Sequence, residues 1–118
     1  MDTRIKIVTA SHAAKEQAAL VRGYFDPLSV AHVRRLEEIA NAGGGLVTIL
    51  LDSPQRPLLP VAARAELLAA LLVVKHVVIA VGALPVEFQG AMIMDETQGD
   101  LLRVQDLIEH VKRRQNGD

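Results

Sequence analysis

A continuous apolar run at residues 46–51 constrains the fold more than any other stretch of the chain. A strand with one face in water alternates apolar and polar residues, whereas a strand of a parallel sheet covered on both faces is apolar throughout. Residues 76–81 have the same two-sided apolar character, and residues 19–22 form a shorter core strand. The three runs predict a parallel sheet with helices on both faces.

Helix signals separate these strands. Ser29 is suited to cap a helix that runs to about residue 42, and Gly43 is expected to end it as a left-handed C-cap. Pro60 suits the first position of a second helix that reaches about residue 73. The expected buried stripe of this helix consists of Val61, Ala65, Leu68, Leu71 and Leu72. The alternation predicts an α/β fold, a three-layer sandwich with a Rossmann-like parallel sheet, in one domain spanning residues 1–118.

The two ends of the chain have weaker patterns. Residues 5–8 fit a short edge strand or an extended leader, and Ser11 is expected to cap a helix over residues 12–18. Residues 86–88 and 91–94 are each expected to form short strands. Asp100 is expected to cap a last helix, whose apolar stripe runs to Val111 and whose end is basic at residues 112–114.

Composition excludes several classes of function. A formal net charge of -1 and an aromatic content of 3% argue against a nucleic-acid partner, and no apolar segment is long enough to indicate a membrane span. The chain has no cysteine, which fits the cytoplasm, the compartment that we expect. His12, His76 and His110 lack the spacing of metal ligands, so no metal-binding residue is predicted from them.

Residues 23–32 are expected to carry the chemistry. Gly23 lets the backbone leave a strand, Asp26 and Pro27 make a turn, and Ser29 caps the helix that follows. A strand that leads directly into a helix aims free backbone N–H groups and the positive end of the helix dipole at one point, which suits phosphate. His32 follows Ser29 by three residues, so the hydroxyl and the imidazole can share one side of the first turn.

This segment resembles the signature G-x-F-D-x-x-[HT]-x-G-H of the cytidylyltransferase-like nucleotidyltransferases, which Gly23, Phe25, Asp26 and His32 match. Heptose-phosphate adenylyltransferase and glycerol-3-phosphate cytidylyltransferase domains are the most similar types. Residues 6–9, residues 32–37 and the stretch from Arg56 to residue 71 also resemble that group, and residues 77–79 fall where the family has its next strand. The resemblance implies transfer of a nucleotidyl group from ATP or CTP to a sugar phosphate or polyol phosphate, with Mg²⁺ and release of pyrophosphate.

The resemblance also implies roles for individual residues. His32 and Ser29 would be the catalytic pair beside the triphosphate. The remaining nucleotide-binding positions would be Gly23, Tyr24, Phe25, Asp26, Arg56 and Arg64. Relatives commonly dimerise, so a homodimer is expected.

Each of these positions also has a purely structural interpretation. Ser29 can act only as a helix cap, and Asp26 can serve only the turn by binding nearby N–H groups. Arg56 and Arg64 fit anion contacts or surface ion pairs equally well. Asp52 either closes its strand or touches a ribose, and the acidic pair at residues 95–96 is either a metal site or a solvated turn.

Several family features are missing. Ser29 stands where the first motif histidine belongs, Ala31 replaces a glycine, and the segment between Asp52 and Arg56 lacks the family's lysine. The acidic residues 95–100 stand where a late hydroxyl and arginine signature would be. Because each lost donor removes electrostatic stabilisation of the transition state, two hypotheses remain. One is a small nucleotidyltransferase, and the other is a non-catalytic nucleotide-binding or subunit-interaction relative.

Overall fold

The computed structural model describes residues 2–99 and contains one parallel sheet. Its four strands are β1 (Ala19–Gly23), β2 (Val47–Leu51), β3 (Val74–Ile79) and β4 (Ile93–Asp95). The strand order is β3-β2-β1-β4, and every neighbouring pair is parallel. The predicted α/β fold with a parallel, Rossmann-like sheet is therefore confirmed.

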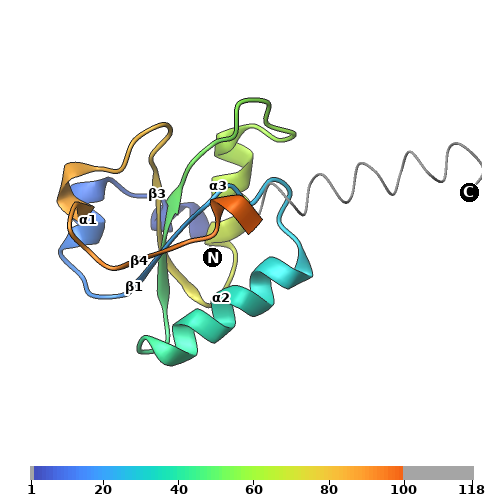
Figure 1. Cartoon of the computed structure of the whole chain (residues 1–118). Helices are drawn as coiled ribbons and strands as arrows, with labels where there is room; N and C mark the ends of the chain where they lie inside the picture. Colours follow the sequence, from blue (N-terminus) through green and yellow to red (C-terminus); the bar gives the residue numbers. More distant parts are fainter. Residues whose placement is uncertain (1, 100–118) are drawn as a thin grey trace, which may run out of the picture.

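Two layers of unequal size cover the sheet. Helices α2 (Val30–Ala42) and α3 (Val61–Ala69) pack on one face through Leu36, Ile39 and Leu68, against Val21 and Ile49. The other layer is thinner. Helix α1 (Ala10–Ala14) and the 3-10 helix η2 (Val86–Phe88) cover Leu50 and Val78 with Ala13 and Phe88. Figure 1 shows α1 on one side of the strands and α2 and α3 on the other.

Helix α2 begins as the sequence predicts and ends differently. Ser29 is its N-cap, as expected, but Gly43 has φ −115°, so it is not a left-handed C-cap. The left-handed residues are Gly44 and Gly45. Gly43 is required for another reason, because a Cβ at that position would lie 2.8 Å from the Cβ of Ala19. The absent side chain lets the end of α2 approach the start of β1.

Helix α3 is shorter than predicted and β3 begins earlier. Pro60 is the N-cap of α3 and precedes its first helical residue, and the helix ends at Ala69. Leu72 therefore lies outside the helix with an exposed fraction of 94%, so its predicted place in the buried stripe is wrong. β3 already begins at Val74, and Val74 is buried in the core.

The N-terminal segment also differs from its prediction. Residues Thr3–Lys6 form a 3-10 helix, η1, and only Ile7 pairs with the sheet, in a bridge to Val77. Helix α1 is capped by Thr9, whose hydroxyl accepts from the N–H of His12, and not by Ser11. The helix also ends earlier than predicted, at Ala14 and not at residue 18.

Of the two short strands expected after β3, one forms. Residues Val86–Phe88 make η2 because Phe88 turns into the core, whereas the second predicted strand appears as β4. The last helix was predicted to begin after a cap at Asp100, whereas residues 97–99 are already helical. The rest of that predicted helix lies outside the described residues.

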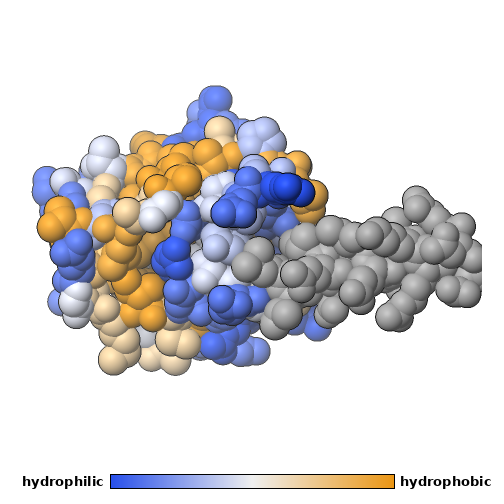
Figure 2. Space-filling view, turned by 45° about the horizontal axis from the view of Figure 1, so that its top comes forward, coloured by the Kyte–Doolittle hydropathy of each residue, from blue (hydrophilic) through white to orange (hydrophobic). Residues whose placement is uncertain are grey.

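No helix within residues 2–99 combines the length and the hydrophobicity that crossing a lipid bilayer requires. Figure 2 shows a broad hydrophobic area beside hydrophilic residues on one face of the molecule. Large hydrophobic side chains are also exposed on the surface as a whole. Those beyond half exposure include Leu58, Val81, Val86 and Met92. Contiguous apolar surface of this kind is typical of protein interfaces.

Candidate functional site

The predicted site lies at the carboxyl edge of the sheet, where β1 leads into α2. β1 pairs with β2 on one side and with β4 on the other. The chain moves outward from β1 through β2 to β3, then returns to place β4 on the opposite side of β1. In open α/β sheets, ligands bind outside the carboxyl ends of the strands at such a reversal of strand order. The turn at residues 24–29 therefore occupies the usual place for a ligand site.

Ser29 and His32 are joined as a reciprocal cap. The Ser29 hydroxyl accepts from the backbone N–H of His32 at 3.3 Å, and the Ser29 N–H donates to Nδ1 of His32 at 3.0 Å. The imidazole is 4% exposed and lies edge-on to Phe25, with ring centres 5.2 Å apart. His32 thus shares the first turn with Ser29, as predicted, but its ring is packed inside the turn and does not project into solvent.

Phe25 and Asp26 hold the turn to the neighbouring loop. Phe25 is buried and has a φ of 47°, which is unusual for a residue with a side chain. The two carboxylate oxygens of Asp26 accept from the N–H groups of Leu58 and Leu59, at 2.6 and 2.8 Å. Asp26 binds backbone N–H groups, as its structural interpretation predicts, but these N–H groups belong to the loop after β2 and not to its own turn.

Arg64 is completely buried beneath this turn. Its guanidinium donates to the carbonyl oxygens of Tyr24, Asp52 and Leu59 and to the Ser53 hydroxyl, at 2.8 to 3.1 Å. Burial lowers the pKa of Arg64, and the charges of Asp26 and Asp52 oppose that effect. The prediction of a surface ion pair is wrong, and the donors that a phosphate would need are directed at protein oxygens.

Arg22, which the sequence did not single out, links the ends of three strands. Its guanidinium, on β1, pairs with Asp52 after β2 and with Asp95 at the end of β4. Asp52 also accepts from the N–H groups of Ser53 and Gly82, so it closes its strand and fixes two loops. Burial opposes the charge on Arg22 most strongly, yet the two carboxylates raise the pKa of Arg22 above its ordinary value.

Asp95 is the last residue of β4 and Glu96 follows it; both carboxylates are paired with protein groups, although the Asp95 side chain is 52% exposed. Asp95 accepts from Thr97 as well as from Arg22, and Glu96 pairs with Arg35 of α2 at 2.7 Å. That ion pair fastens the end of β4 to α2. Burial works against ionisation of Asp95, but its hydrogen bonds with Thr97 and Arg22 hold the pKa of Asp95 below its ordinary value.

The other predicted nucleotide-binding residues differ in exposure. Gly23 is buried, and its carbonyl accepts from the N–H of Asp52. Tyr24 is half-buried. Arg56 is exposed in the loop that Asp26 fastens beside the turn. Among the described residues, Arg56 makes no ion pair, so its charge faces solvent two residues before Leu58, which Asp26 binds.

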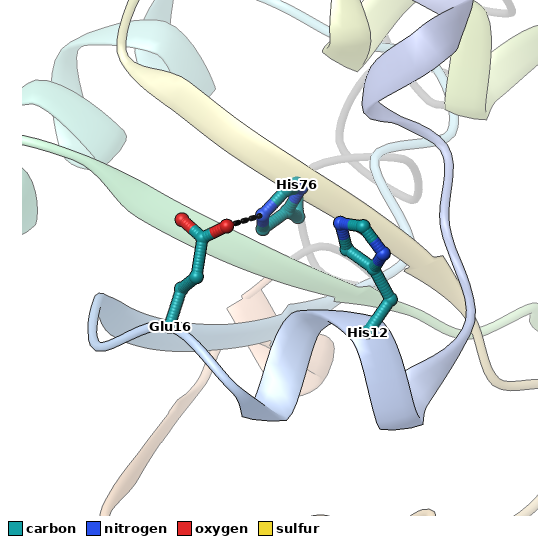
Figure 3. Close-up of side chains that lie close together, drawn as sticks. All are labelled: His12, Glu16 and His76. Carbon is teal, nitrogen blue, oxygen red and sulfur yellow. Dashed lines mark ion pairs between the residues drawn. The ribbon is translucent and has the colours of Figure 1, made fainter.

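The structure also assembles a cluster that the sequence did not reveal. His12 from α1, Glu16 just after it and His76 from β3 bring potential ligand atoms within 4.8 Å of one another (Figure 3). The sequence did not link His12 with His76, because 63 residues lie between them. The four-residue spacing of His12 and Glu16 was the one local signal that two of these side chains could lie close together.

The chain matches no protein-family model, and no curated protein matches it. The nucleotidyltransferase resemblance thus stays a prediction that depends on residues 23–32 and their surroundings.

Proposed function

We propose that this chain binds a nucleoside phosphate at the turn between β1 and α2 without catalysing nucleotidyl transfer. The observation that carries the proposal is the reversal of strand order at β1, which opens the carboxyl edge of the sheet beside this turn. The proposal keeps the nucleotide binding that the resemblance of residues 23–32 implies, but not the nucleotidyl transfer that the family catalyses.

Three groups support binding of an anion at this edge. Helix α2 starts with two exposed residues, Val30 and Ala31, so the positive end of its dipole is open to a ligand. Asp26 fastens the loop after β2 beside the turn, and that loop carries the exposed Arg56. Ser29 is only partly buried and adds a hydroxyl at the same helix end.

The absence of transfer follows from how the other cations are engaged. Nucleotidyl transfer needs positive groups that follow the charge developing on the phosphates. Arg22 is paired with two carboxylates, Arg35 with Glu96, and the donors of Arg64 are directed at four protein oxygens. Releasing any of these would cost hydrogen bonds of about 1 to 3 kcal/mol each.

The Mg²⁺ that the resemblance implies does not fit the donor set at this edge. Asp26 is bound by two backbone N–H groups, and Asp52 and Asp95 are both paired with Arg22. A protein-held Mg²⁺ ion would need these carboxylates as oxygen ligands. We therefore assign the protein no step that depends on Mg²⁺.

Transfer from ATP or CTP to a sugar phosphate or polyol phosphate is the second candidate, and one observation favours it. Because the Ser29 N–H donates to Nδ1 of His32, a neutral imidazole carries its proton on Nε2. Such an N–H in the first turn of α2 could stabilise a leaving pyrophosphate only if the buried ring became accessible to the ligand.

Calorimetric titration of the full chain with ATP and with CTP tests the first proposal. We expect one site for at least one nucleotide, and we expect Arg56→Ala to weaken binding about tenfold, as loss of one charge-assisted contact would. Lys15→Ala is the matched control, because it removes an exposed cation before β1, at the opposite edge of the sheet. Its affinity should equal that of the unaltered chain.

Absence of binding to both nucleotides by the folded protein would refute nucleotide binding, and equal weakening by both variants would refute the assigned position. Pyrophosphate release is then measured with Mg²⁺ and a set of sugar and polyol phosphates. No release supports a binding protein. Release that His32→Gln abolishes while nucleotide affinity persists would replace the first proposal with the transferase.

A further inference from the structure

The cluster of His12, Glu16 and His76 lies apart from the proposed nucleotide site. His76 is in the first half of β3, on the sheet face that α1 covers, whereas α2 covers the opposite face. Figure 3 shows both imidazoles and the Glu16 carboxylate turned toward one another between α1 and β3. The His12 and His76 rings meet edge to face with centres 5.3 Å apart, and Oε1 of Glu16 lies 3.7 Å from Nε2 of His76.

His76 has polar atoms that the protein itself does not satisfy. The residue is 9% exposed, and both of its ring nitrogens are buried without a hydrogen-bond partner. A buried polar group without a partner costs about 1 to 3 kcal/mol. The cost is removed when a ligand supplies the missing interaction, so the buried imidazole points to a ligand in the space it shares with His12 and Glu16.

We propose that His12, Glu16 and His76 form a mononuclear binding site for a divalent first-row transition metal ion, with Zn²⁺ as the natural occupant. Two imidazoles and one carboxylate suit Zn²⁺ and related ions, whereas Mg²⁺ and Ca²⁺ prefer sites made of oxygen atoms alone. Three protein ligands leave at least one coordination position for water or an added ligand.

The geometry requires a small contraction on binding. Ligands of a tetrahedral Zn²⁺ ion at 2.0 to 2.1 Å are about 3.3 Å from one another. The three potential ligand atoms now lie within 4.8 Å, and both His12 and Glu16 are exposed. Rotation of these two side chains can close the difference while the buried His76 stays in place. His12 lies on α1 and Glu16 two residues beyond its end, and both side chains are directed toward β3 (Figure 3).

Lys75 competes with the metal for the carboxylate. Its Nζ pairs with Oε2 of Glu16 at 2.6 Å, and this hydrogen bond and charge lower the pKa of Glu16. This ion pair must be broken before both oxygens of Glu16 can bind the metal. His12 and Glu16 are both exposed, so the remaining coordination position has access to solvent.

Thr48 is placed to orient His76. It is the register partner of His76 on β2, and its buried hydroxyl also lacks a hydrogen-bond partner. A metal-bound histidine usually donates its second ring N–H to a neighbouring oxygen, which fixes the ring and strengthens the bond to the metal. Thr48 is therefore a positioning residue whose hydroxyl takes this role when the metal binds.

The test is titration of the full chain, free of any histidine tag, with Zn²⁺ and with Co²⁺. Calorimetry should give one ion per chain, and the Co²⁺ complex should show the visible absorption of a site with nitrogen ligands. His12→Ala and Glu16→Gln should each weaken binding more than about 100-fold, since loss of an outer-sphere group alone costs about 10- to 100-fold. Thr48→Val should weaken it about tenfold.

Two variants serve as controls. Glu37→Gln neutralises an exposed carboxylate on α2 and should leave the affinity unchanged. Lys75→Gln should increase the affinity several-fold because it frees Glu16. Mg²⁺ and Ca²⁺ in excess should not compete with Zn²⁺. The proposal is overturned if the folded chain binds no ion, or if binding is insensitive to both His12→Ala and Glu16→Gln.

Discussion

The two polar regions of this protein satisfy their polar groups in opposite ways. At the carboxyl edge of the sheet, Arg22, Arg64 and Asp26 are fully occupied with protein partners. On the α1 face, the ring nitrogens of His76 and the hydroxyl of Thr48 are buried without a hydrogen-bond partner. The motif that resembles a known family lies in the first region, whereas the groups that lack partners lie in the second.

This difference shows that residues matching a family signature can serve to stabilise the fold. A buried arginine that binds three carbonyl oxygens, or an aspartate that binds two N–H groups of a neighbouring loop, holds its turn whether or not a ligand is present. Unsatisfied buried groups are more informative about ligands because folding alone does not account for them.

The largest effect that separates the regions is expected from Arg64→Met. This change leaves the carbonyl oxygens of Tyr24, Asp52 and Leu59 without a donor, so we expect a loss of about 3 to 5 kcal/mol in unfolding free energy. Urea denaturation measures it. Arg34→Met, at an exposed position of α2, should stay within about 0.5 kcal/mol. Equal effects of the two changes would contradict a structural role for Arg64.

Asp26→Asn should destabilise the same region less, by about 1 to 3 kcal/mol. The asparagine keeps one oxygen for the N–H of Leu58 or Leu59 but presents an NH₂ group to the other. The loop that carries Arg56 should loosen with it. Faster amide exchange of Leu58 and Leu59 in the variant would show this, and unchanged exchange would argue that Asp26 does not fasten the loop.

His76→Leu should behave in the opposite way in metal-free protein. It replaces a buried ring without hydrogen-bond partners by an apolar side chain of similar size, so we expect no loss and up to about 1 kcal/mol of gain. Thermal unfolding in the presence of a chelator measures this difference. A loss above about 2 kcal/mol would mean that His76 has a polar partner in the protein, and the contrast with Arg64 would fail.

The smallest effect is expected from Asp95→Asn, and it should disappear in acid. The pKa of Asp95 is lowered in the folded state, so its contribution to stability is present above the ordinary aspartate value of about 4 and is lost as the pH falls through the lowered value. The variant should be less stable than the unaltered chain near neutral pH, and the gap should close toward pH 2. Melting temperatures of the two proteins across this pH range measure the difference in stability. A difference that stays constant with pH would indicate a steric effect of the substitution and contradict the prediction.

Local chemistry explains which parts of the fold were predictable. The run at residues 46–51 predicts β2 because a strand covered on both faces has no polar position, and Ser29 predicts the start of α2 because capping depends on adjacent residues. A glycine is needed at residue 43, as predicted, but because of the close approach to Ala19 and not because of a left-handed backbone. Ala19 is distant in the sequence, so no local pattern reveals this approach.

The candidate sites depend more heavily on distant contacts. The residues of the turn were identified from their order, but whether Arg64 faces solvent or the interior depends on oxygens from three other segments. The approach of His76 to His12 likewise depends on α1 covering β3, which follows from the assembled sheet and not from either residue's neighbours.

The position of β4 has a consequence for synthesis of the chain. β1 leaves the ribosome before the other three strands of this sheet, and the edge that β4 covers stays open until residues 93–95 have followed. An unpaired edge of an apolar strand is a template for pairing between nascent chains. Slow translation of the segment between β3 and β4 should therefore lengthen the period in which this protein is most prone to aggregate.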